Sequence, residues 1–122
     1  MYHHAAIPVI DLEKSQSFYE RFGFVKLRDW SKPTEELSAV VLEKDSFILE
    51  LICHPTHQVL IPSPVIESKH IGISVPELEN LLAVLKEEGV AVLKPITKGV
   101  SVKEFCFIAD PNGNVVELLV EN

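Results

Sequence analysis

The alternation of hydrophobic and polar positions predicts the same order of elements twice along the chain. In the first half the order is a strand, a helix and three strands. These elements are predicted at residues 3–9, 12–21, 24–31, 37–43 and 46–54. Asp11 is suited to the N-cap of the helix, and Gly23 is suited to its C-terminal end. Lys44-Asp45 is predicted to form a tight turn between the last two strands.

The second half repeats this order. Its elements are predicted at residues 69–75, 77–88, 90–95, 101–109 and 114–121. Gly89 ends the helix, and Asp110-Pro-Asn-Gly113 is a strong turn signal. When the halves are overlaid, the offset is 66 residues at the helix start (from 11 to 77) and 67 in the last strand (from 50 to 117). One additional loop residue accounts for this difference, and the matching order indicates an internal repeat.

We therefore predict an α+β fold in a single domain over residues 1–122. The repeat comprises residues 1–54 and 68–122, and residues 55–67 join them. This joining segment contains Pro55, Pro62 and Pro64, so it is predicted to be an extended linker. A chain of 122 residues can bury a core large enough to fold without a partner.

Charge and composition exclude several classes of function. The formal net charge is −7 and no Lys/Arg cluster is present, which argues against binding to nucleic acid or an anionic membrane. The longest apolar runs are strand-sized and the first residues lack the pattern of a signal peptide. Cys53 and Cys106 follow no metal or redox spacing. We therefore expect a cytoplasmic protein with reduced thiols and no membrane partner.

Two apolar strands each carry one glutamate, and each glutamate is matched to a histidine. Glu50 lies in Phe47-Ile-Leu-Glu-Leu-Ile and Glu117 in Val115-Val-Glu-Leu-Leu-Val. His4 opens the first strand of one half and His70 the first strand of the other. A carboxylate on a buried strand is costly unless it is paired, protonated or bound to a metal. The duplicated pattern indicates one shared polar site, although His3 remains an alternative to His4 because neighbouring strand residues face opposite ways.

Several of these residues also carry a family resemblance. The motifs are His4-x6-Asp11-Leu-Glu-Lys-Ser, Phe18-Tyr19, Gly23-Phe24 and Asp110-Pro-Asn-Gly-x-x-x-Glu117. Together with the repeated element order, they resemble the vicinal oxygen chelate superfamily, which includes glyoxalase I, methylmalonyl-CoA epimerase, extradiol dioxygenases and bleomycin-binding proteins. The resemblance covers essentially the whole chain. It implies two βαβββ modules whose curved mixed sheets form a cleft.

The resemblance also implies a metal site and a reaction. The family's ligand positions correspond to His4, Glu50, His70 and Glu117, and this set is most similar to that of glyoxalase I. It implies one divalent ion, Ni or Zn in the first place and Co, Mn or Fe as alternatives. The implied activity is a metal-dependent lyase or isomerase that acts on a small substrate through an enediolate. Glu117 is the preferred base, and Glu50 is its counterpart.

The resemblance leaves the substrate open. Pro8 occupies the position of the arginine that holds the glutathione carboxylate in short glyoxalase I chains, so glutathione is not implied. Arg28 and Lys69 are candidate replacements. His54 has the same strand parity as Glu50 and is a secondary candidate for the site, while Trp30 is a candidate to stack on a substrate or to close a dimer.

Alternative functions are a non-enzymatic ligand-binding protein of the bleomycin-resistance type, an epimerase of the same superfamily, and a structural or regulatory domain. The resemblance further implies a homodimer with shared sites. In such a dimer His4 and Glu50 of one chain meet His70 and Glu117 of the other.

Overall fold

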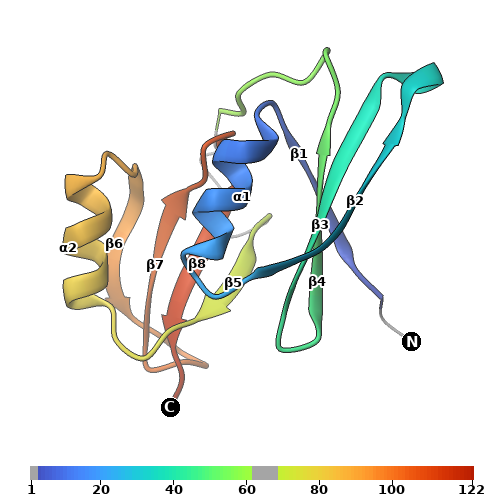
Figure 1. The fold of residues 1–122 in the computed structure, drawn as a ribbon. Coiled ribbons are helices and arrows are strands. Elements are labelled where there is room, and N and C mark those ends of the chain that lie inside the picture. Colours follow the sequence, from blue (N-terminus) through green and yellow to red (C-terminus); the bar gives the residue numbers. More distant parts are fainter. Residues whose placement is uncertain (1–2, 62–68) are drawn as a thin grey trace. The chain divides into compact units, whose positions relative to one another are not determined.

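The computed structural model describes residues 3–61 and 69–122, and it divides into two compact units, residues 1–60 and 61–122. Each unit contains one α-helix and one four-stranded mixed sheet (Figure 1). The α+β fold with two βαβββ modules is therefore confirmed. In the described residues, no helix is long and apolar enough to span a bilayer.

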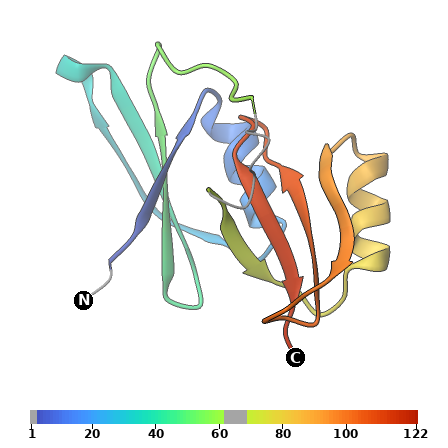
Figure 2. The same cartoon turned by 180° about the vertical axis from the view of Figure 1, so that it is seen from behind.

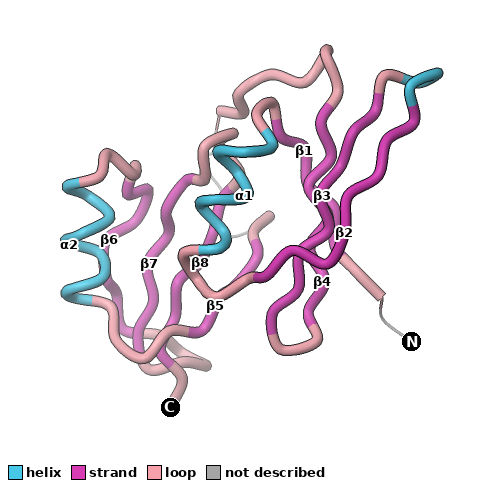
Figure 3. Tube along the Cα trace, viewed as in Figure 1, coloured by secondary structure: helices cyan, strands magenta, loops and turns pink. Residues whose placement is uncertain are grey.

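The first unit places its N-terminal strand beside its last strand. Its elements are β1 (Ala5–Val9), α1 (Leu12–Glu20), β2 (Val25–Lys32), a 3₁₀ turn η1 (Pro33–Glu35), β3 (Leu37–Lys44) and β4 (Phe47–Cys53). The strand order in the sheet is β1-β4-β3-β2, with β1 parallel to β4 and the other pairs antiparallel (Figure 3). As a result β4 lies inside the sheet, between β1 and β3.

The helix of the first unit begins and ends as the sequence predicts. The Asp11 side chain caps α1 by accepting a hydrogen bond from the Lys14 amide (3.0 Å). Gly23, with φ +95°, follows the helix in the left-handed region that favours glycine. The helix contacts β3 and β4, and Tyr19 is fully buried. The core of the unit therefore lies between α1 and one face of the sheet.

Two local predictions in the first unit are wrong in detail. The tight turn is formed by Asp45 and Ser46, with φ 49° and 69°, because Lys44 still pairs with Phe47 in the strand ladder. Two left-handed residues are what a two-residue hairpin needs to match the strand twist. The start of the predicted extended linker is a turn, closed by the His57 amide and the His54 carbonyl (2.9 Å). Residues 62–67 of that linker, including Pro62 and Pro64, lie outside the described residues.

The second unit repeats the topology of the first. Its elements are β5 (Ile71–Ser74), α2 (Glu79–Glu87), β6 (Val92–Lys98), β7 (Glu104–Ala109) and β8 (Val115–Val120). The strand order is β5-β8-β7-β6, and β5 is parallel to β8, the red strand in Figure 2. Gly89 (φ +89°) follows the helix as predicted. The helix starts two residues later than expected, and the Glu77 side chain accepts from the Asn80 amide (3.1 Å).

The last hairpin of each unit explains the change of offset between the halves. The Asp110 amide donates to the Asn114 carbonyl (2.9 Å), which closes the second hairpin over Pro111, Asn112 and Gly113. The first hairpin is closed over only two residues. Asp110 Oδ1 also accepts from the amides of Asn112 (2.9 Å) and Asn114 (2.8 Å), so this aspartate organises the turn. The additional residue therefore lies in the turn that leads into β8, and Glu117 keeps the sheet position of Glu50.

Candidate functional site

Glu50 lies on the face of its sheet that is opposite the core. Its neighbours Leu49 and Leu51 are fully buried, and successive strand residues point to opposite faces. Because β1 runs parallel to β4 with Ala5 opposite Leu49, His4 lies just before the paired residues and reaches the glutamate. The His4 Nε2–Glu50 Oε1 distance is 3.7 Å, with the Glu50 side chain 17% exposed. The first predicted pair is thus brought together.

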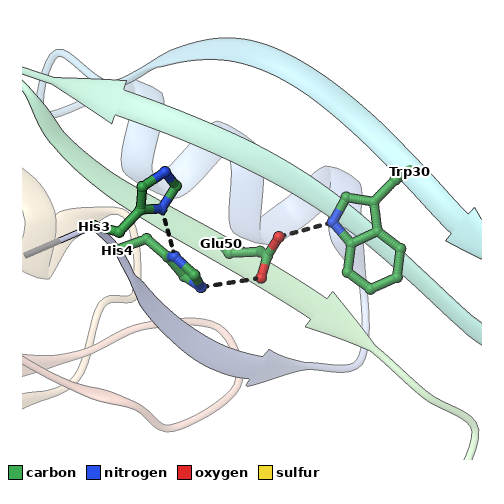
Figure 4. Close-up of polar contacts among 4 residues, drawn as sticks. All are labelled: His3, His4, Trp30 and Glu50. Atoms are coloured by element: carbon green, nitrogen blue, oxygen red, sulfur yellow. Dashed lines mark hydrogen bonds and ion pairs between the residues drawn. The ribbon is translucent and has the colours of Figure 1, made fainter.

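The Glu50 carboxylate has a second partner on the same face of the sheet, on the strand beyond β3. Trp30 Nε1, on β2, donates a hydrogen bond to Glu50 Oε2 at 2.7 Å (Figure 4). On the other side, Nδ1 of His3 and Nδ1 of His4 are 2.8 Å apart. The four residues form one polar chain, His3–His4–Glu50–Trp30 (Figure 4). Of the two neighbouring histidines, it is therefore His4 that faces the carboxylate.

The second pair lies at the equivalent position of the other unit. His70 Nε2 is 3.0 Å from Glu117 Oε1, and both side chains are mostly buried. The His70 ring also packs edge-on against Phe107, with ring centroids 5.0 Å apart. Gly72 of β5 stands opposite Glu117 in the ladder. A Cβ at Gly72 would lie 3.3 Å from Leu119 Cδ2, which is tight, and 3.7 Å from Glu117 Oε1, which is ordinary van der Waals contact, so any larger side chain here would press on both.

A buried thiol lies on the core face of the second sheet, which is the face opposite that of Glu117. Cys106 on β7 is fully buried, and burial raises its pKa to about 11, with the charges of Glu117 and Glu104 contributing to the rise. The thiol therefore stays protonated at neutral pH and packs as a small apolar group, as the sequence predicts. Cys53 of the first unit is partly exposed, and its Sγ is 3.7 Å from the Ile10 carbonyl oxygen.

The donor atoms of the second pair have the spacing of two ligands on one divalent ion, and those of the first pair lie a few tenths of an ångström wider apart. Two ligand atoms, each about 2.1 Å from one ion at angles of about 90–110°, are about 3.0–3.4 Å apart. The observed N–O distances are 3.7 Å for His4–Glu50 and 3.0 Å for His70–Glu117. Over residues 3–61 and 69–122, however, no three or more His, Cys, Asp or Glu side chains converge. Each unit thus offers one nitrogen and one oxygen ligand, which is half of a four-ligand set.

The secondary candidates have other surroundings. His54 lies in the turn after β4, where its Nδ1 is 2.7 Å from Thr56 Oγ1 and accepts from the Thr56 amide (3.1 Å). Arg28 stands opposite Val41, which in turn stands opposite Glu50, so it shares the face of the glutamate. The contact between Trp30 and Glu50 is a feature of the candidate site that sequence reasoning missed. The signal was the single tryptophan of the chain in a strand, but nothing in the pattern gave its partner.

Comparisons with known proteins agree with this architecture. Residues 2–118 match the family model of the Glyoxalase/Bleomycin resistance protein/Dioxygenase superfamily. The chain therefore belongs to this superfamily, as its motifs indicate. A trypanothione-dependent glyoxalase I of Leishmania major is 30% identical in sequence and superposes with a TM-score of 0.79, over 98% of this chain and 85% of that one.

Two further relatives are of similar length. A glyoxalase family protein from Enterococcus faecalis is 25% identical, with a TM-score of 0.77 over 98% of this chain and 96% of that one. An uncharacterized protein of Bacillus subtilis (strain 168), YwkD, is 28% identical over 121 residues, which is 95% of this chain and 93% of the relative. The structural neighbours of this chain thus include glyoxalase I enzymes and proteins whose names state no activity.

Proposed function

We propose that this protein is a metal-dependent lyase or isomerase of the glyoxalase I type, acting on a small substrate with neighbouring oxygen atoms. The observation that carries the proposal is the duplicated pair, in which a histidine Nε2 faces a glutamate Oε1 at the same sheet position of both units. His4, Glu50, His70 and Glu117 would hold one divalent ion, with Ni or Zn preferred and Co, Mn or Fe as alternatives. When bound, the ion would polarise the substrate oxygens and so acidify the adjacent C–H bond.

Glu117 is the proposed base. In the described part of the chain its one hydrogen-bond or ion-pair partner is His70, whereas Glu50 is held from both sides by His4 and Trp30. A carboxylate with fewer fixed partners can turn from a ligand position towards a substrate proton and return it to the neighbouring carbon. Glu50, held more rigidly, is suited to remain a ligand.

The experiment that tests this proposal is elemental analysis of the purified protein followed by a substrate screen. The metal-free chain is reconstituted separately with Ni²⁺, Zn²⁺, Co²⁺, Mn²⁺ and Fe²⁺ and assayed against hemithioacetals of methylglyoxal with glutathione and with other low-molecular-weight thiols. Activity that is lost on chelation and restored by the ion supports the proposal. Inactivity under every ion, with tight stoichiometric binding of a planar drug by the metal-free chain, would instead favour a bleomycin-resistance type of binding protein.

We further propose a homodimer in which each site takes His4 and Glu50 from one chain and His70 and Glu117 from the other. In support, each unit supplies only half of the ligand set. The edge strand β2 also leaves apolar side chains uncovered, with Val25 57% and Leu27 44% exposed. Such a surface is suited to a second copy of the chain.

Mixing two inactive variants tests the shared site. In a heterodimer of Glu50→Ala and Glu117→Ala chains, one site keeps all four ligands and the other loses both glutamates. Random mixing should therefore restore about one quarter of wild-type activity. Verified heterodimers without any recovery would show that each chain builds its own site.

A further inference from the structure

The single tryptophan of the chain makes its polar contact with a proposed metal ligand. Trp30 is partly buried on β2, and its Nε1–H points at Glu50 Oε2 over 2.7 Å (Figure 4). Nothing in the repeated motifs requires a tryptophan at this position. We infer that Trp30 is a positioning residue that fixes the Glu50 carboxylate and sets the affinity of the first histidine–glutamate pair for the ion. This inference rests on the proposed function.

The physical basis is the chemistry of the indole group. An indole N–H is a donor only and it does not ionise, so its capacity to donate to the Glu50 side chain does not change with pH. A hydrogen bond of 2.7 Å to a charged acceptor is at the short, strong end of the range. It occupies Oε2 and leaves Oε1 directed towards His4. A ligand whose orientation is already fixed loses less conformational freedom when it binds an ion, and such outer partners are typically worth about 10–100-fold in metal affinity.

The other unit shows that this contact is not a general property of the fold. Trp30 stands opposite Ala39, and the equivalent register position in the second sheet is Thr97, opposite Phe105. The Thr97 hydroxyl donates instead to the Pro95 carbonyl at 2.8 Å. Within residues 3–61 and 69–122, a tryptophan–glutamate hydrogen bond is thus found in the first unit and not in the second. This difference favours Glu50 as the anchored ligand and leaves Glu117 with one fixed partner.

Trp30→Phe is the direct test, because it keeps an aromatic ring and removes the donor. Calorimetric titration of the metal-free full-length chain with Ni²⁺ or Zn²⁺ should show an affinity about 10–100-fold weaker than wild type. Circular dichroism and the thermal midpoint check that the variant is folded. Thr97→Val is the matched control at the equivalent position and should bind the ion as wild type does.

A second measurement leaves Trp30 in place and needs no metal. The chain has one tryptophan, so a ¹⁵N-labelled sample gives one indole N–H signal, which reports the hydrogen bond to Glu50 directly. Glu50→Gln should move this signal upfield because a neutral amide is a weaker acceptor, whereas Glu117→Gln should leave it in place. This NMR measurement tests the hydrogen bond between Trp30 and Glu50 even if the Trp30→Phe variant does not fold.

The possible outcomes separate the inference from the proposed function. Wild-type affinity in a folded Trp30→Phe variant would overturn the role of Trp30 and leave the metal site standing. An indole N–H signal that does not shift in the Glu50→Gln variant would also overturn the role of Trp30 and leave the metal site standing. A wild-type chain that binds none of the divalent ions would overturn the proposed metal site and, with it, the role of Trp30.

Discussion

The two histidine–glutamate pairs occupy equivalent sheet positions and differ in how the carboxylate is held. In the first unit the His4–Glu50 distance is 3.7 Å, and Trp30 holds the other carboxylate oxygen at 2.7 Å. In the second unit His70 lies 3.0 Å from Glu117 and packs against Phe107. The repeated register therefore sets the positions of the glutamate and the histidine, while residues outside the motif set how many partners each carboxylate has.

Under the proposed function, we expect this difference to give the two glutamates unequal roles. A glutamate held from two sides is a stable ligand, and a glutamate held from one side can also move a proton.

The largest effect is expected at Glu117. Glu117→Gln should lower turnover of any confirmed substrate by about 10²–10⁴-fold, because an amide cannot accept the substrate proton. Glu50→Gln should lower turnover less, since Glu50 is the proposed anchored ligand and not the proposed base. Steady-state kinetics on the metal-loaded proteins measures both, with Glu121→Gln as a control for a glutamate outside the two pairs. If Glu117→Gln keeps wild-type turnover, the assignment of the base is wrong.

The cysteines of the two units should differ strongly in reactivity. A pKa raised from 9.0 to about 11 lowers the thiolate fraction of Cys106 at pH 8 by about 100-fold, and burial slows reagent access further. Iodoacetamide at pH 8 should therefore alkylate the partly exposed Cys53 first and Cys106 only after unfolding. Peptide mass spectrometry separates the two sites. Because burial favours the neutral thiol, the thiolate of Cys106 forms only at high pH. Alkylation of Cys106 in the folded protein should therefore rise as the pH approaches 11.

A smaller effect is expected at the glycine beside the second carboxylate. Gly72→Val adds side-chain atoms next to Glu117 and Leu119, so it should displace the carboxylate and weaken metal affinity by about 10-fold. Ala6→Val is the matched control, because Ala6 stands opposite Glu50 as Gly72 stands opposite Glu117. Calorimetry measures both affinities. A Gly72→Val chain that binds as tightly as wild type would show that the site does not depend on this space.

Some features of the protein follow from the sequence because they are local. The cap at Asp11 and the glycines at 23 and 89 depend on the conformations of a few neighbouring residues. The alternation of side chains along a strand has a fixed period of two, so it places Glu50 and Glu117 on the faces opposite the core. The internal repeat then matches each glutamate to a histidine, and the structure brings both matched pairs together.

The tertiary structure decided what depends on register between strands. A bulge in β2 between Lys26 and Arg28 shifts the pairing by one residue, so Trp30 stands opposite Ala39 on the face of Glu50. Without the bulge, Asp29 would take that position and set a second carboxylate beside the first. The sequence determined the element order, the caps and the face of each glutamate. Which side chains meet across a sheet was decided by bulges and turns, because these set the alignment of residues that are far apart in the chain.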